Sequence, residues 1–288
     1  MKERIVSAIF IVATVVVAFL LRLLDVRLFD LLICFLALAC TLEVVSALKD
    51  KISNLHKWLA LIFPITAFPI AVFLGFFVFA YTAGYALLAL TLTVVTFKQE
   101  VVNGEPQPID FSEFGKFLFV LFYPSVPLLF LTFSNLMLGN LSLFALLTVI
   151  VTSSISDVFA FVFGSLIKGK KLARAISPNK TVSGMIAGVI GSALCMVILY
   201  FTCVAFGYNP FFGLDAFSVI LFLVVSGLFF GVTSQAGDLF ESALKRSLSV
   251  KDTGNLLPGH GGVLDRADSW VFTSVAVYLV FVLYSFLA

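Results

Sequence analysis

The segment 237–268 carries the residues best suited to chemistry. It holds nine charged residues among 32, about 28%, whereas charged residues make up 12% of the whole chain. Asp238, Ser242 and Lys245 follow one another at i, i+4 and i+7. This spacing places the three side chains on one face of a helix that continues from the preceding apolar segment. An acid, a hydroxyl and a base are therefore expected side by side.

Two more acids and a glycine-rich turn follow this helical face. Asp265 and Asp268 are i, i+3 neighbours at the start of the last apolar segment. Between them and the helix, residues 258–262 (Pro-Gly-His-Gly-Gly) form a flexible turn whose backbone can approach a ligand closely. Carboxylates without cysteine or clustered histidine offer hard oxygen ligands, which suit Mg²⁺ rather than Zn²⁺. The acids of this segment are therefore suited to Mg²⁺.

Basic side chains alternate with these acids, namely Lys245, Arg246, Lys251 and Arg266. Without another partner these bases would pair directly with the acids. With a metal and several phosphates present, the acids can instead hold the metal, and the phosphates can bind both the metal and the bases, so that the charges balance. Phosphoryl and nucleotidyl transfer are catalysed largely by such positioning and charge neutralisation. The alternative is a set of interfacial salt bridges that pins two membrane spans. The charge density and the glycine turn favour the catalytic interpretation.

A second basic run lies at 168–180, with five basic residues and no acid. Its first half fits a topology determinant or a patch that touches anionic lipid heads. Residues 177–181 (Ser-Pro-Asn-Lys-Thr) open the next apolar segment, where free backbone N–H groups and the helix dipole favour an anion. We therefore expect Ser177, Lys180 and Thr181 to contact a phosphate.

Asp157 and Glu43 are carboxylates inside apolar segments. Asp157 lies in the middle of one, beside several serines, and a carboxylate at bilayer depth usually faces a polar cavity or a partner. A cavity that reaches into the membrane and a simple hydrogen bond to a neighbouring helix both remain open for Asp157. Glu43 lies nearer the end of its segment and is interpreted as a snorkelling or paired residue. The charged stretch 98–116 is interpreted as an ordinary solvated loop.

Composition defines the elements that must position these side chains. Hydrophobic residues make up 61% of the 288 residues, the net charge is +2, and the mean hydropathy is +1.14. Such a chain has too few polar groups for a soluble fold and too little charge for a nucleic-acid binder. The four cysteines lie in apolar runs without metal-binding or disulfide spacing. Nine apolar segments are long enough to span a bilayer, at 5–24, 28–48, 58–75, 78–97, 117–134, 141–167, 181–206, 214–236 and 269–287.

The sequence thus predicts an all-α, polytopic transmembrane helix bundle of about nine spans with a polar cavity that faces the cytoplasm. We expect one integral membrane unit, with spans one to five in residues 1–134 and the catalytic spans six to nine in residues 135–288. With a cytoplasmic N-terminus, sixteen of the eighteen lysines and arginines lie inside and only Arg22 and Arg27 lie outside. The C-terminus is then external. No organelle-targeting segment is evident, so a bacterial inner membrane is expected.

The spacing of residues in the segment 242–268 resembles a known signature. It comprises Ser242 to Arg246, Lys251-Asp252, Gly254, Leu257-Pro258, His260-Gly261-Gly262, Asp265-Arg266 and Asp268. This pattern resembles that of the phosphatidate cytidylyltransferases, also called CDP-diacylglycerol synthases. Upstream, Ser177-Pro178, Lys180-Thr181 and Gly184 resemble the family's S-P-x-K-T-x-x-G element, and Asp157, Ala160 and Gly164 resemble its aspartate-bearing span. Val182, Ser183 and Ala267 depart from the family pattern.

The resemblance implies a reaction in phospholipid biosynthesis. CTP and phosphatidic acid give CDP-diacylglycerol and pyrophosphate, with Mg²⁺ required and room for a second cation, in a membrane protein that is commonly a homodimer. Within that reaction the four bases named above hold phosphates, and Asp238, Asp265 and Asp268 hold the metal. The further substrate contacts are Ser177, Lys180, Thr181, Ser242, His260, Gly261 and Gly262. For His260, a phosphate donor, a proton donor to pyrophosphate and a turn-stabilising residue all remain open.

Other functions fit parts of the pattern. A polyprenol or phytol kinase, or an archaeal-type CDP-lipid synthase, would share the bundle and a charged, glycine-bearing loop. A transporter or flippase would use Asp157 as a coupling site, but it often has paired repeats with interrupted helices, and the ionisable residues here concentrate late in the chain. A structural scaffold leaves the glycine–histidine turn unexplained. The signature therefore favours the nucleotidyltransferase.

Overall fold

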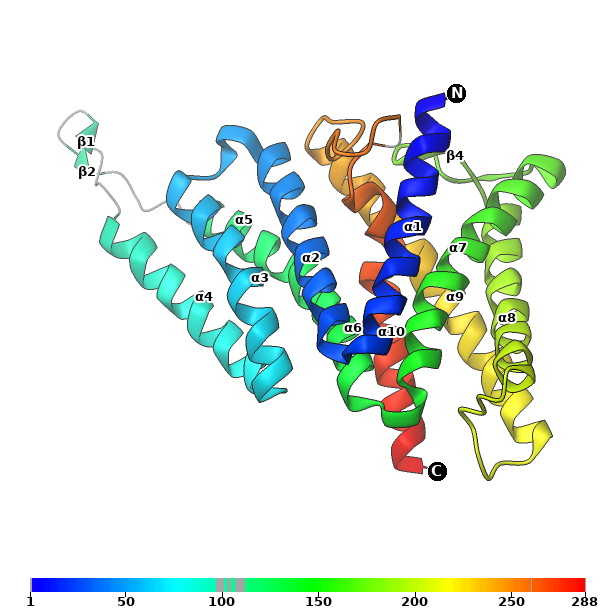
Figure 1. Ribbon diagram of the computed structural model, residues 1–288. Helices are drawn as coiled ribbons and strands as arrows, with labels where there is room; N and C mark the ends of the chain where they lie inside the picture. Colours follow the sequence, from blue (N-terminus) through cyan, green and yellow to red (C-terminus); the bar gives the residue numbers. More distant parts are fainter. Residues whose placement is uncertain (1, 97–100, 103–104, 107–111, 260, 288) are drawn as a thin grey trace.

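The computed structural model describes the backbone of residues 2–96, 101–102, 105–106, 112–259 and 261–287. Within these ranges eight helices are long and apolar enough to cross a membrane, and they stand side by side as one bundle (Figure 1). Large apolar side chains such as Phe77, Phe161 and Phe217 are exposed on its outside. A surface of this kind suits contact with lipid rather than with water. The predicted polytopic helix bundle is confirmed.

The chain begins with α1 (Lys2–Leu24), α2 (Val26–Leu48), the short turn η1 (Lys49–Lys51), α3 (Asn54–Leu74) and α4 (Phe77–Thr96). Asp25 starts α2, because its side chain accepts a hydrogen bond of 2.8 Å from the N–H of Arg27. Gly75 separates α3 from α4 with a φ of +57°, a conformation that favours glycine. The described apolar part of α1, Ile9–Leu24, is shorter than the other candidate spans.

The middle of the chain contains an interrupted span. After the strands β1 (Val101–Val102) and β2 (Glu105–Pro106), this span consists of α5 (Ser112–Val120), the π-helical segment η2 (Leu121–Ser125) and α6 (Val126–Met137). The short 3-10 turn η3 (Gly139–Leu141) follows it. The sequence predicts an unbroken span over 117–134, but the backbone of Tyr123 is extended, with φ −136° and ψ 117°. The residue before a proline is disfavoured in the helical region, and Pro124 follows. The Ser125 hydroxyl lies 2.8 Å from that of Thr41 on α2.

The last part of the chain holds four long helices and a hairpin. These are α7 (Ser142–Ile167), β3 (Lys171–Ala173), β4 (Ser177–Thr181), α8 (Val182–Ala205), α9 (Ala216–Ser247) and α10 (Leu264–Leu287). The strands are antiparallel, with Lys171 opposite Thr181 and Ala173 opposite Ser177. The basic run 168–180 is therefore largely a β-hairpin, which the sequence analysis does not predict.

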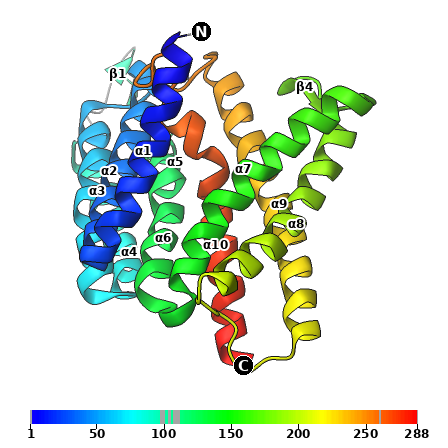
Figure 2. The same cartoon turned by 45° about the vertical axis from the view of Figure 1, so that its right-hand side comes forward.

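Small residues bring α8, α9 and α10 close together. A Cβ at Gly227 would lie 2.6 Å from the Cα of Ala193 on α8, and one at Gly237 would lie 2.6 Å from the carbonyl oxygen of Asp268 on α10. In lipid, helices associate mainly by such close packing. Figure 2 shows α10 between the group formed by α1 to α6 and the group formed by α7 to α9. The central position of α10 puts its first turn within reach of both groups.

The bundle has two distinct ends. The start of α1, the β3–β4 hairpin and the connection between α9 and α10 lie at one end, and α10 finishes at the other (Figure 1). The candidate site residues are thus gathered at the end where the chain begins. His260 lies outside the described residues, as does much of the stretch 98–116.

Candidate active site

The last turns of α9 present charged side chains at helical spacing. The hydroxyl of Ser242 donates a hydrogen bond of 3.4 Å to Oδ1 of Asp238, one turn away. Lys245 Nζ lies 2.7 Å from Oε2 of Glu241, an i, i+4 ion pair in which the glutamate is fully buried. The predicted face of Asp238, Ser242 and Lys245 is thus formed on one helix. Glu241 adds a buried acid that the sequence analysis does not include.

Asp265, in the first turn of α10, connects α9 to the loop that precedes α10. Its Oδ1 lies 2.7 Å from Lys245 Nζ. Its Oδ2 accepts hydrogen bonds from the backbone N–H of Gly262 at 2.7 Å, the N–H of Thr253 at 3.0 Å and the Thr253 hydroxyl at 3.1 Å. A Cβ at Gly261, where φ is +85°, would lie 2.8 Å from the same oxygen. Glycine is therefore required where the loop passes over this carboxylate.

Glu43 supports the same loop from α2. Its side chain is 7% exposed. Oε1 accepts the N–H of Val263 at 2.8 Å, and Oε2 accepts the N–H of Leu264 at 2.8 Å and the Thr253 hydroxyl at 3.3 Å. A carboxylate that accepts N–H groups at the start of a helix satisfies donors that have no partner within the helix, and it interacts favourably with the helix dipole. Glu43 is therefore a buried, paired residue that caps α10.

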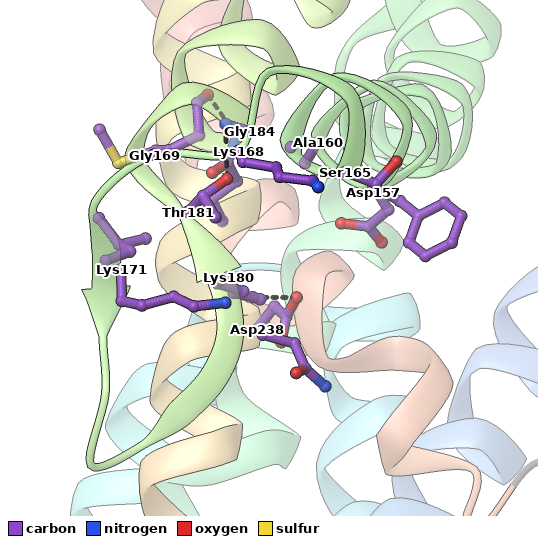
Figure 3. A pocket seen from close by; sticks show the side chains of 16 residues that line it. Asp157, Ala160, Ser165, Lys168, Gly169, Lys171, Lys180, Thr181, Gly184 and Asp238 are labelled. Carbon is purple, nitrogen blue, oxygen red and sulfur yellow. Dashed lines mark hydrogen bonds and ion pairs between the residues drawn. The ribbon is translucent and has the colours of Figure 1, made fainter.

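The β3–β4 hairpin is tied to α9 by two contacts. Lys180 Nζ forms an ion pair with Oδ2 of Asp238 (Figure 3). Arg246 Nε donates to the carbonyl oxygen of Ile176 at 3.2 Å. At the end of the hairpin, the Thr181 hydroxyl accepts the N–H of Gly184 at 3.2 Å and so caps α8. The hairpin thereby holds its lysine beside the acid on α9.

Three cavities with charged residues in their linings surround these residues. The hairpin cavity, of about 680 Å³, is lined by residues that include Asp157, Lys168, Lys171, Asn179, Lys180, Thr181, Gln235 and Asp238 (Figure 3). The acidic cavity, of about 420 Å³, is lined by residues that include Asp157, Asp238, Lys245, Asp252, Asp265, Arg266 and Asp268. The loop cavity, of about 500 Å³, is lined by residues that include Lys251, Asp252, Asn255, Pro258, Gly261 and Arg266. Asp157 and Asp238 border both of the first two cavities, so these two cavities meet there.

The acidic cavity has the charge balance of a cation site. Five aspartates line it against two bases. Within the described part of the chain, no three acidic, histidine or cysteine side chains lie close enough to one another to hold a metal ion. Mg²⁺ does not need such a cluster, because it is commonly bound by one or two carboxylates together with substrate phosphates. The hard oxygen donors of this cavity therefore fit Mg²⁺ shared with a phosphate-bearing ligand.

The structure brings most of the predicted site residues together. The predicted metal ligands Asp238, Asp265 and Asp268 line one cavity, together with Lys245 and Arg266. Lys251 and Gly261 line the loop cavity, and Lys180 and Thr181 line the hairpin cavity. Gly262 and Ser242 contact carboxylates of the site. Ser177 lies in the hairpin opposite Ala173, and Arg246 binds the hairpin backbone.

Sequence reasoning missed three residues that organise the site. Glu241 pairs with Lys245, and its i, i+4 spacing was a usable signal. Thr253 donates to both Glu43 and Asp265. Gln235 donates to Ser156 Oγ at 3.3 Å and to the Met185 carbonyl at 2.9 Å, and it lines the hairpin cavity. For Thr253 and Gln235 the sequence offers no signal, because their partners come from distant helices.

Fold and cavities define a polytopic membrane protein with a charged, phosphate-compatible site at one end of its bundle, as expected of a membrane-embedded transferase. Residues 2–284 match the cytidylyltransferase family, and the chain belongs to that family of enzymes. It is similar to the phosphatidate cytidylyltransferase of Rickettsia felis, with 35% identity over 177 residues, which cover 61% of this chain and 74% of the relative.

Two further relatives carry the same name. The Bacillus subtilis protein is 41% identical over 130 residues, which cover 45% of this chain and 44% of the relative. The Rickettsia bellii protein is 38% identical over 128 residues, which cover 44% of this chain and 53% of the relative. The aligned segments thus span about half the length of these two relatives. The predicted resemblance to this family is confirmed.

Proposed function

We propose that this chain transfers the cytidylyl group of CTP to phosphatidic acid, giving CDP-diacylglycerol and pyrophosphate for phospholipid synthesis. Three relatives named phosphatidate cytidylyltransferase support this assignment. The observation that carries it is the acidic cavity, where Asp238, Asp265 and Asp268 face Lys245 and Arg266. The acids of this cavity can hold Mg²⁺, whose positive charge acts together with Lys245 and Arg266 on the phosphate oxygens of the substrates.

The reaction is an in-line displacement at phosphorus. An oxygen of the lipid phosphate forms a bond to the α-phosphorus of CTP, and the bond from that phosphorus to the bridging oxygen of the β-phosphate breaks. Pyrophosphate leaves with the electron pair. Because the lipid phosphate is already anionic at neutral pH, the step requires no strong general base. Catalysis then depends on positioning and on neutralising the charge that develops on the phosphates.

The bases divide between the cavities. Lys245 and Arg266 border the acidic cavity and neutralise charge on the reacting phosphates. Lys251 and the glycine turn border the loop cavity, where backbone and side chain together can hold the leaving pyrophosphate. Lys180 binds a phosphate in the hairpin cavity once its ion pair with Asp238 opens. Arg246 contributes by holding the hairpin against α9.

Asp238 and Asp268 are the residues that would hold Mg²⁺, since both line the acidic cavity. Asp265 would join them when Lys245 turns towards a phosphate, because its Oδ1 is engaged by that lysine. When bound, Mg²⁺ supplies positive charge that neutralises the phosphate oxygens during displacement. A second cation, the homodimer and the substrate contacts of Ser177, Ser242 and His260 stay predictions.

The proposed location is a bacterial inner membrane with the site facing the cytoplasm. Sixteen of the eighteen lysines and arginines would then lie inside. The start of α1 lies at the same end of the bundle as the site, and α10 finishes at the opposite end (Figure 1). A cytoplasmic N-terminus therefore goes together with a cytoplasmic site and an external C-terminus, and CTP reaches the site from the cytoplasm.

The test uses purified protein in detergent micelles with labelled CTP and phosphatidic acid. We expect an Mg²⁺-dependent CDP-lipid and an equal amount of pyrophosphate, with CTP preferred over ATP and GTP. Transfer of a γ-phosphate from any nucleotide to a lipid would instead indicate a kinase. Metal-independent lipid movement across liposomes, without a CDP-lipid, would indicate a transporter. Either result would overturn the proposal.

A further inference from the structure

An apolar groove adjoins the charged site. It has a volume of about 200 Å³ and lies among α1, α2, α7 and α10. Figure 1 and Figure 2 both show α1 between α2 and α7. The residues that define it here are Ile11, Val15, Phe19, Ile33, Arg266 and Trp270. The site residues described above account for the charged end of this groove but not for its apolar walls.

The groove lies next to the acidic cavity. Ile11, Arg266 and Trp270 line both spaces. A ligand that passes from one to the other would therefore cross from apolar walls to a guanidinium and then to the acids and bases of the site. Phosphate oxygens pair well with an arginine, and an acyl chain belongs in an apolar environment. The juxtaposition matches a lipid whose head is a phosphate.

The length of the groove matches one membrane leaflet. Its lining on α1 extends over ten residues, from Phe10 to Phe19, a rise of ~14 Å at ~1.5 Å per residue. The hydrocarbon core of a bilayer is ~30 Å thick, so the groove reaches about half-way across it. Its volume of about 200 Å³ is below the roughly 300–1,000 Å³ of pockets that enclose a whole small molecule. It therefore suits part of one chain rather than an entire lipid.

We propose that this groove binds one acyl chain of the lipid substrate and so places the lipid phosphate beside Arg266, in the acidic cavity. The proposal rests on the proposed function, because it takes phosphatidic acid as the lipid. The second acyl chain stays in the surrounding bilayer. The groove then determines how deep the phosphate sits, and the chain length of the lipid affects its binding.

A matched pair of variants tests the groove. Val15 lines it, whereas Val16, the next residue on α1, is 51% exposed on the outside of the bundle. In Val15→Phe the larger ring fills the groove, and we expect the KM for long-chain phosphatidic acid to rise about tenfold, as for the loss of ~two buried methylenes. The KM for CTP stays unchanged. Val16→Phe behaves as the wild type.

Chain length separates a blocked groove from a damaged fold. Because a shorter chain places fewer carbons past Val15, we expect Val15→Phe to differ less from the wild type with phosphatidic acid of six-carbon chains than with the long-chain lipid. An equal loss with short and long chains would mean that the substitution harms the protein generally, and it would overturn the proposal. Identical behaviour of Val15→Phe and Val16→Phe with the long-chain lipid would overturn it as well.

Crosslinking tests the groove without turnover. The probe is phosphatidic acid with a photoreactive diazirine in the middle of one acyl chain, added to the wild-type protein, with the labelled residues mapped by mass spectrometry. We expect labels on residues 11–19 of α1 and 29–36 of α2, and fewer in Val15→Phe. Labels spread evenly over the exposed apolar surface would overturn the proposal. If labels map to the groove but no CDP-lipid forms, the proposed function fails while the lipid site stands.

Discussion

Asp265 is the residue on which most contacts of the site converge. It links Lys245 on α9 to Thr253 and Gly262 in the loop. In Asp265→Asn the ion pair is lost and an NH₂ group faces backbone donors. Lys245 and the loop then lose the position that Asp265 gives them at the site. Losing ~2 kcal/mol of transition-state stabilisation corresponds to about thirtyfold in rate, and we expect kcat to fall at least that much. Turnover of purified protein measures this effect.

The first control for Asp265→Asn is a check that the purified variant is folded. Size-exclusion elution and melting temperature in detergent should show that the variant is folded. Asp252→Asn is a matched substitution on the same loop, because Asp252 is exposed and also borders the acidic cavity. We expect it to cost less than Asp265→Asn. Full activity of folded Asp265→Asn would contradict the role given to this carboxylate.

Glu43 acts on the site through the loop rather than on a substrate. In Glu43→Gln one acceptor is replaced by a donor that faces the N–H of Val263 or Leu264. Hydrogen bonds to charged groups contribute ~1.5–3 kcal/mol each. We expect at least a tenfold fall in kcat with a smaller change in the KM for CTP, because α10 and its aspartates lose their position. Steady-state kinetics with both substrates measure the split.

Glu43→Asp distinguishes positioning from simple stability. The shorter carboxylate keeps the charge, so it should recover part of the lost kcat. If Glu43→Gln and Glu43→Asp both melt at a lower temperature than the wild type but keep its kcat, Glu43 stabilises the fold and has no role in positioning the site.

At the scale of elements, close packing of α8 and α9 positions the site's helices. A Cβ at Gly227 would meet Ala193 Cα at 2.6 Å, whereas a Cβ at Gly84 on α4 meets no atom within 4 Å. Alanine favours a helix by ~1 kcal/mol over glycine, but overpacking costs ~1–3 kcal/mol. We expect Gly227→Ala to lower the melting temperature by several degrees and Gly84→Ala to leave it equal or higher. Thermal unfolding in detergent compares the two, and equal melting points would contradict the packing argument.

The parts of the site that the sequence predicts are those whose residues lie close together in the chain. The charged face of α9 and the acids at the start of α10 follow from residues within two helical turns of one another, which sequence displays directly. The cap on α10 comes from Glu43, some 220 residues earlier in the chain. The break at Tyr123 has a local signal in Pro124, and the hairpin that positions Lys180 pairs residues at most ten apart. The contact of Glu43 with the loop, in contrast, joins distant parts of the chain. Such long-range pairings leave no period in the sequence.

At the scale of the whole molecule, the two ends of the bundle differ in the charge of the residues gathered there. One end gathers the hairpin, the charged cavities and the loop before α10, while the other end carries short turns such as Gly139–Leu141. The apolar groove lies beside the charged end, and its walls suit an acyl chain. Hydrophilic and lipid substrates can therefore meet without either crossing the bilayer, provided that the charged end faces the cytoplasm.

That orientation is testable by cysteine labelling in cells. Ser247 at the end of α9 and Asn140 in the turn before α7 are both exposed and lie near opposite ends of the bundle. In a background where Cys34, Cys40, Cys195 and Cys203 are replaced by alanine, we expect a membrane-impermeant maleimide to label Asn140→Cys in intact cells. Ser247→Cys should be labelled only after permeabilisation, because the excess of basic residues keeps its end inside. The cysteine-free background gives the control for non-specific labelling, and CDP-lipid synthesis confirms that it folds. Labelling of Ser247→Cys in intact cells would reverse the orientation and put the charged cavities on the side away from cytoplasmic CTP.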